Sequence, residues 1–395
     1  MARRRGVSRQ GETHTVSRAR NGPMHLLVFS AEPLASGYGS ATALRTFIRA
    51  ALVHSDWRII LVAPGPPADD WQLPPARVRR LAAGGGQSMG RRAQLLGYTA
   101  GALLRAATAE RLRPDVVLSW QPMPAGLAGA VASRHGGTPH IVRTCGPELA
   151  RSWSRFPAFT AILRPLTLRV LREADAVVVK SEVEGGLLGP SIDERRVHLI
   201  PNAVGPEFFV SRRARAGAAT RLLAVCQLEA HKGVAQLLSA LGALRDRRGG
   251  QVRLTVAGDG SQRARLERAA ARAGIEAAFF GRVPHAGVPA LCTVHDALVL
   301  PSLLEGCANA ALEAMAAGLP VIGHRSALRD LVHDGVNGVL AATPDVHGLE
   351  QALERFLSAG AIVTGMRIAA RRRAAGHSPE RLVASYRDLL EDVAG

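Results

Sequence analysis

Two glutamates, Glu305 and Glu313, stand with seven residues between them in the segment PSLLEGCANAALEAMAAGLPVIG, residues 301–323. The segment is otherwise mostly apolar and rich in alanine, and its residues 308–317 have the composition of a helix. On one interpretation, both carboxylates are solvated surface charges. On the other, they line a cleft, because carboxylates accept hydrogen bonds from the vicinal hydroxyls of a ribose or a hexose.

The loop Gly306–Cys307 lies at the start of this predicted helix. Backbone N–H groups at a helix N-terminus lack intrahelical partners and the helix dipole is positive there, so the loop suits a phosphate group. Gly306 also lets a ligand approach the backbone closely. Glutamates on either side of such a helix start suit a nucleotide sugar, which carries both hydroxyls and phosphates.

Lysine is rare in this chain, which has 48 arginines but only 2 lysines. A lysine is a compact point charge on a thin stem, and arginine cannot always replace it. Lys232 follows an apolar run and precedes Gly233, so it can neutralise a pyrophosphate. The other lysine, Lys180, ends the run ADAVVVK and receives no predicted role.

Apolar runs that read as strands alternate with helix-like stretches along the chain. This alternation predicts an α/β fold of parallel sheets with helices on both faces. Two such doubly wound sheets facing one another create a cleft, and ligands bind at the carboxyl ends of the strands. The expected strands are residues 24–30, 57–65, 114–120, 140–146, 174–181, 221–228, 252–260, 277–283, 297–302 and 319–323.

The length of 395 residues favours two domains. Two Gly-x-Gly turns follow expected strands, Gly37-Tyr38-Gly39 and Gly258-Asp259-Gly260, and each permits a tight turn that faces a ligand, although such a turn alone is weak evidence. We expect a disordered Arg-rich tail over residues 1–22, an N-terminal domain over 23–205, a linker over 206–220, a C-terminal domain over 221–375 and a crossover helix over 376–395.

The formal net charge of +18 raises the possibility of a nucleic-acid partner. The tail supplies +5 of that charge, and the excess of arginine over lysine indicates a nucleotide bias of the genome. No basic stripe interleaved with aromatic residues is present, so we expect no specific nucleic-acid binding. Peripheral contact with an anionic membrane remains a possibility, although the Arg-rich segments 90–113 and 151–173 are better read as ordinary amphipathic helices.

The remaining composition indicates a globular protein of the cytoplasm. No apolar run approaches the length of a membrane-spanning helix, and the first residues have no apolar core of a secretory signal. The four cysteines are scattered without a CxxC pair, so we expect reduced thiols. No Asp-x-Asp occurs and no His, Asp and Glu residues have metal-ligand spacing, so we expect neither a required metal nor a cofactor.

The segment EGCANAALEAMAAGLPVIG resembles the E-x7-E signature of retaining GT-B glycosyltransferases of family 4. The resemblance implies two Rossmann-like doubly wound parallel-sheet domains that face a cleft, with a C-terminal helix that returns to the N-domain. It extends over nearly the whole chain after the tail, through ADAVVVKS (174–181), IPNAV (200–204), VCQLEAHKGVAQLLSAL (225–241) and LVHDGVNGVL (331–340).

This resemblance also implies roles for particular residues. Glu313 would hold the ribose hydroxyls of the donor. Glu305 and Lys232 would be catalytic, Glu305 at the transferred sugar or its phosphate and Lys232 at the diphosphate. The acceptor would face the N-domain, which we therefore expect to be the acceptor side. Further donor contacts would come from Asn309, Gly306, Cys307, Gln227, Arg282, Val283, Gly37 and Gly39.

Three segments depart from the pattern of the family. Where Gly-Arg-Leu is usual, the chain has Cys226-Gln227-Leu228, so Gln227 brings hydrogen bonds but no charge to the diphosphate. Where His-Gly-x-Asp is usual, it has Cys145-Gly146-Pro147-Glu148. We retain Cys145, Gly146 and Glu148 as possible contacts on the acceptor side. The usual Asn-Gly-Val-Asp is replaced by Asn202-Ala203-Val204-Gly205.

The resemblance implies a retaining, metal-independent transfer of a hexose from a nucleotide-diphosphate donor to a hydroxyl acceptor. A UDP-sugar is favoured over a GDP-sugar as donor. The acceptor stays open between a glycolipid, a polysaccharide and a small aglycone. Two alternatives keep the same fold, namely a sugar-nucleotide epimerase and a degenerate, non-catalytic partner subunit.

Overall fold

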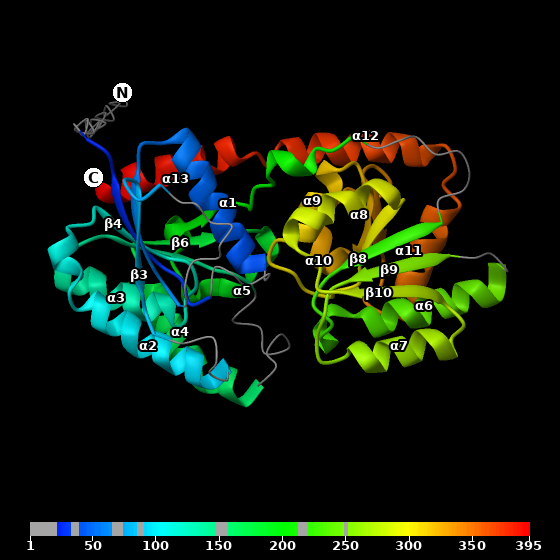
Figure 1. Ribbon diagram of the computed structural model, residues 1–395, viewed down its shortest axis with the longest axis horizontal. Coiled ribbons are helices and arrows are strands. Elements are labelled where there is room, and N and C mark those ends of the chain that lie inside the picture. The colour runs from blue at the N-terminus through cyan, green and yellow to red at the C-terminus, as the bar shows by residue number, and fades with distance from the viewer. Residues whose placement is uncertain are drawn as a thin grey trace, which may run out of the picture.

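The computed structural model describes residues 22–32, 39–64, 74–84, 91–146, 157–211, 220–248 and 252–395, without the side chains of 91–95 and 157–162. Within this part of the chain, the strands form two fully parallel sheets. Each sheet carries helices on both faces, and the two halves of the molecule lie next to each other (Figure 1). The predicted fold class is therefore confirmed.

The first sheet has the strand order β3-β2-β1-β4-β5-β6-β7 in the described residues. Its central strands are buried on both faces: Leu26 and Val28 of β1 contact one core, and Leu27 and Phe29 contact another. Runs of apolar residues without alternation are typical of such strands. The strands are β1 (His25–Phe29), β2 (Arg58–Ala63), β3 (Val78–Ala82), β4 (Val116–Ser119), β5 (His140–Arg143), β6 (Ala176–Val179) and β7 (Val197–Leu199).

Helices cover the two faces of this first sheet. One face carries α1 together with the C-terminal helix α13, and the other carries α2 and α3. The helices of this half are α1 (Gly39–His54), α2 (Arg91–Ala106), α3 (Ala125–Gly136), α4 (Pro157–Glu173) and α5 (Glu182–Leu188).

The second sheet has the order β10-β9-β8-β11-β12-β13. Its central strands are almost wholly apolar, and the helices around it form two cores, one with α6, α7 and α11 and one with α8 and α9. Its elements are β8 (Arg221–Val225), α6 (Val234–Arg248), β9 (Arg253–Ala257), α7 (Arg263–Arg272), β10 (Glu276–Gly281), α8 (Val288–Val294), β11 (Ala297–Leu300), α9 (Asn309–Ala316), β12 (Val321–His324), α10 (Arg325–Leu328), β13 (Gly338–Ala341), α11 (Val346–Leu357) and α12 (Ile362–Ala375).

The chain passes between the two halves twice, and the two crossings lie together. Val204 N–H donates a hydrogen bond to the carbonyl of His377 over 3.0 Å. After the second crossing, α13 (Pro379–Ala394) packs against α1, with the Tyr386 ring 4.8 Å from the Phe47 ring. The expectation that the C-terminal helix returns to the N-domain is confirmed.

Every strand expected from the sequence is present, and three further strands occur. β3 was missed because it holds two arginines and only Val78 of it is buried, as expected of a strand at the sheet edge. β7 is three residues long and half-exposed at the other edge. β13 overlaps the end of the segment 331–340 over which the family resemblance extends. The expected domain limits stay predictions, and residues 1–21 and 212–219 lie outside the described residues.

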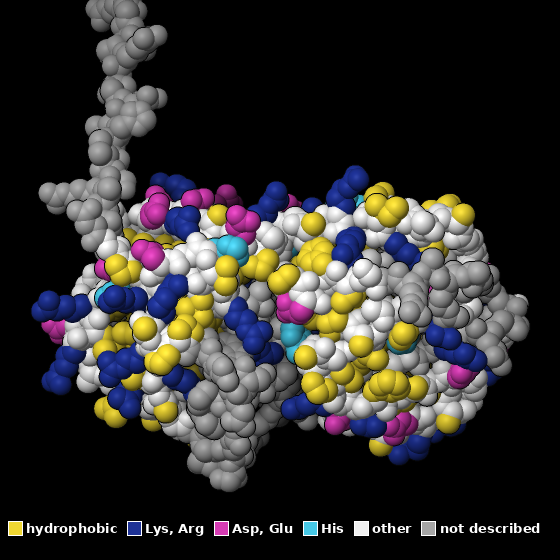
Figure 2. Space-filling view, turned by 45° about the horizontal axis from the view of Figure 1, so that its top comes forward, with side chains coloured by type: hydrophobic (Ala, Val, Ile, Leu, Met, Phe, Trp, Pro, Cys, Tyr) yellow, Lys and Arg dark blue, Asp and Glu magenta, His cyan; other side chains and the backbone are white. Residues whose placement is uncertain are grey.

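The arginines that dominate the charge do not gather in one stripe on the face seen in Figure 2, where they are interspersed with acidic and apolar side chains. None of the described helices is both long and apolar enough to span a membrane. Contact with an anionic membrane therefore stays a prediction.

One histidine of the first sheet is buried as an uncharged group. His140, at the start of β5, is 2% exposed, and its Nε2 lies 2.8 Å from the Ser119 hydroxyl oxygen. Burial lowers the pKa of His140 to about 3, because the charged imidazolium would lose its hydration. The unfolded chain then binds a proton near pH 6.5 that the folded chain does not, so stability falls as the pH falls below that value.

We therefore predict that acidification from pH 6.5 to pH 5 lowers the free energy of unfolding of the unmodified protein by about 1.5 kcal/mol more than that of His140→Gln. Urea unfolding curves at the two pH values measure the difference. Parallel pH dependences in the two proteins would contradict the assignment of a neutral, buried His140.

A second prediction concerns the returning helix. Leu390 of α13 is fully buried in the core that α13 shares with α1, so Leu390→Ala should lower the free energy of unfolding by about 2–4 kcal/mol. The exposed Asp392 on the same helix gives a control, because Asp392→Ala should change the value by less than about 0.5 kcal/mol. Equal effects of the two substitutions in urea unfolding would show that α13 is not docked as described.

Candidate active site

A cavity of about 970 Å³ opens between the two sheets. Its walls come from the segments that follow the carboxyl ends of β1, β4, β5 and β6 on one side and of β8, β9, β10 and β11 on the other. Ligands bind at this edge of parallel sheets because the connecting loops and helix N-termini gather there. The volume is in the range of pockets that hold small organic ligands.

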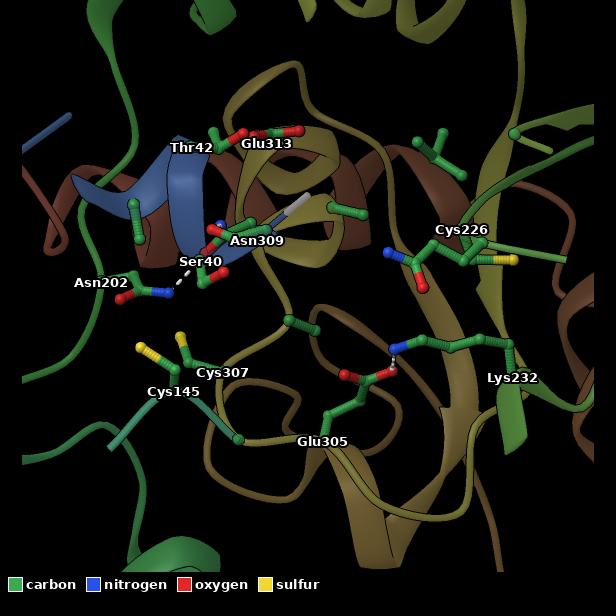
Figure 3. Close-up of a pocket in the computed structure, with 18 of the residues that line it drawn as sticks. Ser40, Thr42, Cys145, Asn202, Cys226, Lys232, Glu305, Cys307, Asn309 and Glu313 are labelled. Atoms are coloured by element: carbon green, nitrogen blue, oxygen red, sulfur yellow. Dashed lines mark hydrogen bonds and ion pairs between the residues drawn. The ribbon is translucent and has the colours of Figure 1, made fainter. Parts of the chain in front are cut away.

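An ion pair lies on the C-terminal wall of the cavity (Figure 3). Lys232 Nζ is 2.6 Å from Glu305 Oε1, and the two side chains are only 14% and 10% exposed. Lys232 ends a short 3-10 helix after β8, and Gly233 follows with a φ of +71°. A Cβ at Gly233 would lie 2.3 Å from the carbonyl oxygen of Pro301, so only glycine lets this loop reach the end of β11.

Glu313 lies on the second turn of α9 and faces the same cavity (Figure 3). It is 8% exposed, as is Glu305, so neither carboxylate is a solvated surface charge. The loop Glu305–Ala308 leads into α9, and the N-cap residue Ala308 makes no side-chain hydrogen bond to the first turn. That helix start therefore keeps the N–H donors that suit a phosphate.

His285 is a site residue that the sequence interpretation missed. Its Nε2 lies 2.8 Å from Glu313 Oε1, and its ring centroid is 5.0 Å from that of Phe208. The signal available in the sequence was its place three residues after Arg282, next to the expected donor contacts Arg282 and Val283. His285 holds the Glu313 carboxylate in one orientation at the cavity edge.

A polar network joins the two domains at the wall of the cavity. Asn309, the first residue of α9, accepts a hydrogen bond from the Asn202 amide and donates one to the carbonyl of Gly39 over 2.8 Å. Asn202 in turn accepts from Arg143, whose guanidinium is buried and lies 4.2 Å from the centroid of the Trp120 ring. The Asn309 amide is thus engaged between domains in this structure.

The N-terminal wall also carries Cys145 and Lys180. The Cys145 thiol donates to the carbonyl of Trp120, and Cys145 and Cys307 lie beside each other from opposite domains (Figure 3). Burial raises the pKa of the Cys307 thiol. Lys180, to which the sequence gave no role, is buried and lines the cavity.

Most of the predicted site residues lie around this one cavity. Gly146 lies next to Gly306, which lines the cavity: a Cβ built at Gly306 would be 3.2 Å from Gly146 Cα. Gly37 and Glu148 lie outside the described residues. The remaining predicted residues all line the cavity, namely Glu305, Lys232, Glu313, Asn309, Gly306, Cys307, Gln227, Arg282, Val283, Gly39 and Cys145. Their individual roles stay predictions.

In the described part of the chain, no three His, Cys, Asp or Glu side chains are grouped so as to hold a metal ion.

Known proteins resemble both halves of this chain. Residues 39–203 match the family described as "Glycosyl transferase 4-like domain", and residues 219–359 match "Glycosyl transferases group 1". "Glycogen synthase" of Mycobacterium tuberculosis is 32% identical over 282 residues, which are 69% of this chain and 67% of that protein. "2-deoxystreptamine glucosyltransferase" of Streptomyces kanamyceticus is 30% identical over 251 residues, 58% of this chain and 64% of that protein's length.

A comparison of folds agrees with these sequence matches. The crystal structure of Anabaena HepE in complex with UDP and glucose superposes with a TM-score of 0.73 at 17% sequence identity, covering 93% of this chain and all of that one. The fold of this chain thus has a counterpart in a solved structure. The chain belongs to the group 1, family 4-like glycosyltransferases and has their GT-B fold.

Proposed function

We propose that the protein is a retaining, metal-independent glycosyltransferase that moves a hexose from a UDP-sugar to a hydroxyl acceptor. The observation that carries the proposal is the convergence of Glu305, Glu313 and Lys232 on one cavity between the domains. Membership of the glycosyltransferase family supports the reaction type. Binding of UDP by the structural neighbour HepE supports the choice of nucleotide.

The donor would lie along the C-terminal wall of the cavity. Glu313, oriented by His285, would accept hydrogen bonds from the ribose hydroxyls. The diphosphate would lie between Lys232 and the start of α9, where an ammonium group and unpaired N–H donors offset its charge. The hexose would then extend toward the N-terminal wall.

Catalysis in this arrangement is electrostatic. When the bond between the anomeric carbon and the phosphate oxygen breaks, negative charge grows on the leaving diphosphate, and Lys232 is placed to stabilise it. In the structure Lys232 already pairs with Glu305, so the ammonium is held in place before the donor arrives. The acceptor hydroxyl would attack from the face that the diphosphate leaves, and the departing phosphate would take its proton.

A direct test is calorimetric titration with UDP, UDP-glucose and GDP-mannose. We expect binding of UDP and UDP-glucose, and Glu313→Ala should weaken both by about 10- to 100-fold, since hydrogen bonds to a charged group contribute about 1.5–3 kcal/mol. The exposed Glu391 gives the control, because Glu391→Ala should bind as the unmodified protein does.

The proposal fails if the unmodified protein binds none of the three ligands, or if Glu313→Ala binds UDP as tightly as the unmodified protein. Binding of UDP-glucose without transfer to water or any sugar acceptor would favour the non-catalytic partner subunit. Conversion of UDP-glucose into an epimer without acceptor would favour the epimerase.

A further prediction concerns His285. His285→Ala should weaken UDP binding by about 3- to 10-fold, less than Glu313→Ala does, because Glu313 stays in place but loses the partner that orients it. His285→Gln keeps a side-chain N–H donor and should recover most of the affinity. Equal affinities of His285→Ala and the unmodified protein would exclude a positioning role for His285.

A further inference from the structure

The two lysines of the chain line the same cavity from opposite domains. Lys232 lies on the C-terminal wall, and Lys180, directly after β6, lies on the N-terminal wall. All other basic positions among the 50 are arginine, so lysine is retained at two sites that face one ligand-binding space. Lys180 lies on the wall of this cavity but has no role in the function proposed above.

Lys180 is held by a fixed carboxylate. Its Nζ lies 3.2 Å from Glu184 Oε1, and the two side chains are 4% and 2% exposed. The other oxygen, Glu184 Oε2, accepts the backbone N–H of Lys180 over 2.8 Å. The backbone of Glu184 is fixed in turn by the hydroxyl of Ser181, the N-cap of α5. The carboxylate therefore cannot turn away from Lys180 without loss of these bonds.

The pair retains hydrogen-bonding capacity. Among the described residues, Lys180 Nζ makes this one ion pair and no side-chain hydrogen bond, and Glu184 Oε1 has no hydrogen-bond donor. Taking both charges out of water is costly, and two apolar side chains would fill the same space at no such cost. Glu184 Oε1 is the one acceptor among the described residues that pairs with this ammonium, so a ligand in the cavity that accepts from Lys180 Nζ would explain its burial on the wall.

The pair lies directly against the loop that begins α9. A Cβ at Gly306 would lie 2.7 Å from Lys180 Nζ and 2.8 Å from Glu184 Oε1, so Lys180 reaches the backbone of the loop between Glu305 and Asn309. Under the function proposed above, the diphosphate lies at this loop and the transferred sugar extends from there toward the N-terminal wall, on which Lys180 lies. Lys180 therefore approaches the sugar from the side opposite to Lys232.

We propose that Lys180, positioned by Glu184, is a specificity-determining residue that donates a hydrogen bond to a hydroxyl of the transferred sugar. This inference rests on the proposed function. Because Glu184 offsets the charge of Lys180, the pair presents a hydrogen-bond donor without net charge. It therefore suits a neutral, hydroxylated hexose and gives no advantage to a sugar that carries a carboxylate or a phosphate.

The test compares the binding of UDP-glucose with that of UDP, which lacks the glucose. Lys180→Met keeps an unbranched side chain that matches the lysine stem up to Cε, and it removes the ammonium with its donors. We expect Lys180→Met to bind UDP-glucose at least about tenfold more weakly, and UDP within about twofold of the unmodified protein. A deoxyglucose series of UDP-sugars then locates the contact, because one deoxy position should cost the unmodified protein affinity and cost Lys180→Met none.

Two further variants serve as a second test of the pair and as a control for lost stability. Glu184→Gln keeps the shape of the partner, leaves the Lys180 charge uncompensated and should also lower the ratio of UDP-glucose to UDP affinity, which matters if Lys180→Met fails to fold. Arg367→Met breaks a partly buried ion pair with Asp296 in the second domain, away from the cavity. It should lower the thermal midpoint and leave that ratio unchanged.

The outcomes separate the two proposals. If Lys180→Met weakens UDP and UDP-glucose equally, or weakens neither, the specificity role of Lys180 is overturned and the proposed function stands. If every deoxy analogue loses as much affinity in Lys180→Met as in the unmodified protein, Lys180 contacts no hydroxyl. If the unmodified protein binds neither UDP nor UDP-glucose, both proposals fall.

Discussion

The ion pair between Lys232 and Glu305 joins the two loops on which the candidate site is built. One loop follows β8 and the other follows β11, which are neighbours in the second sheet. Both charges are largely withdrawn from water, so each needs the other, and removal of one would leave the other buried without compensation. The close packing of Gly233 against the end of β11 brings the loops near enough for the pair to form.

The cleft also depends on how the two domains meet. The chain crosses between them twice, the crossings are hydrogen-bonded to each other, and α13 docks on α1. Near the cavity, Asn309 bonds to both Asn202 and Gly39, so the helix that carries Glu313 touches the connecting segment and the N-domain together. The contact between the domains and the position of the loop that begins α9 therefore depend on the same hydrogen bonds.

Two of the departures from the family pattern, at Gln227 and Cys145, change the charge of the cavity wall. Gln227 lines the cavity without a charge, so of these two cavity residues that follow β8 Lys232 is the one that brings a positive charge. Cys145 takes the place of the usual histidine and donates to the Trp120 carbonyl, so it does not supply a charged contact. Lys180 brings an ammonium to the same wall from β6.

The two parallel sheets could be predicted from the amino-acid sequence alone, because buried strands leave uninterrupted apolar runs. That Glu305, Glu313 and Lys232 line one cleft could also be predicted, because their types and spacing are local features of single loops and helices. The edge strand β3 was not predicted, because its two arginines interrupt the run of apolar residues by which the other strands were recognised. The contacts between these side chains and their partners became known only from the tertiary structure. They are His285 with Glu313, Arg143 with Asn202, and Lys180 with the loop at Gly306. These contacts join segments that are 28 to 126 residues apart in the sequence, and such contacts depend on how the helices, loops and two domains pack, which no short pattern of residues records.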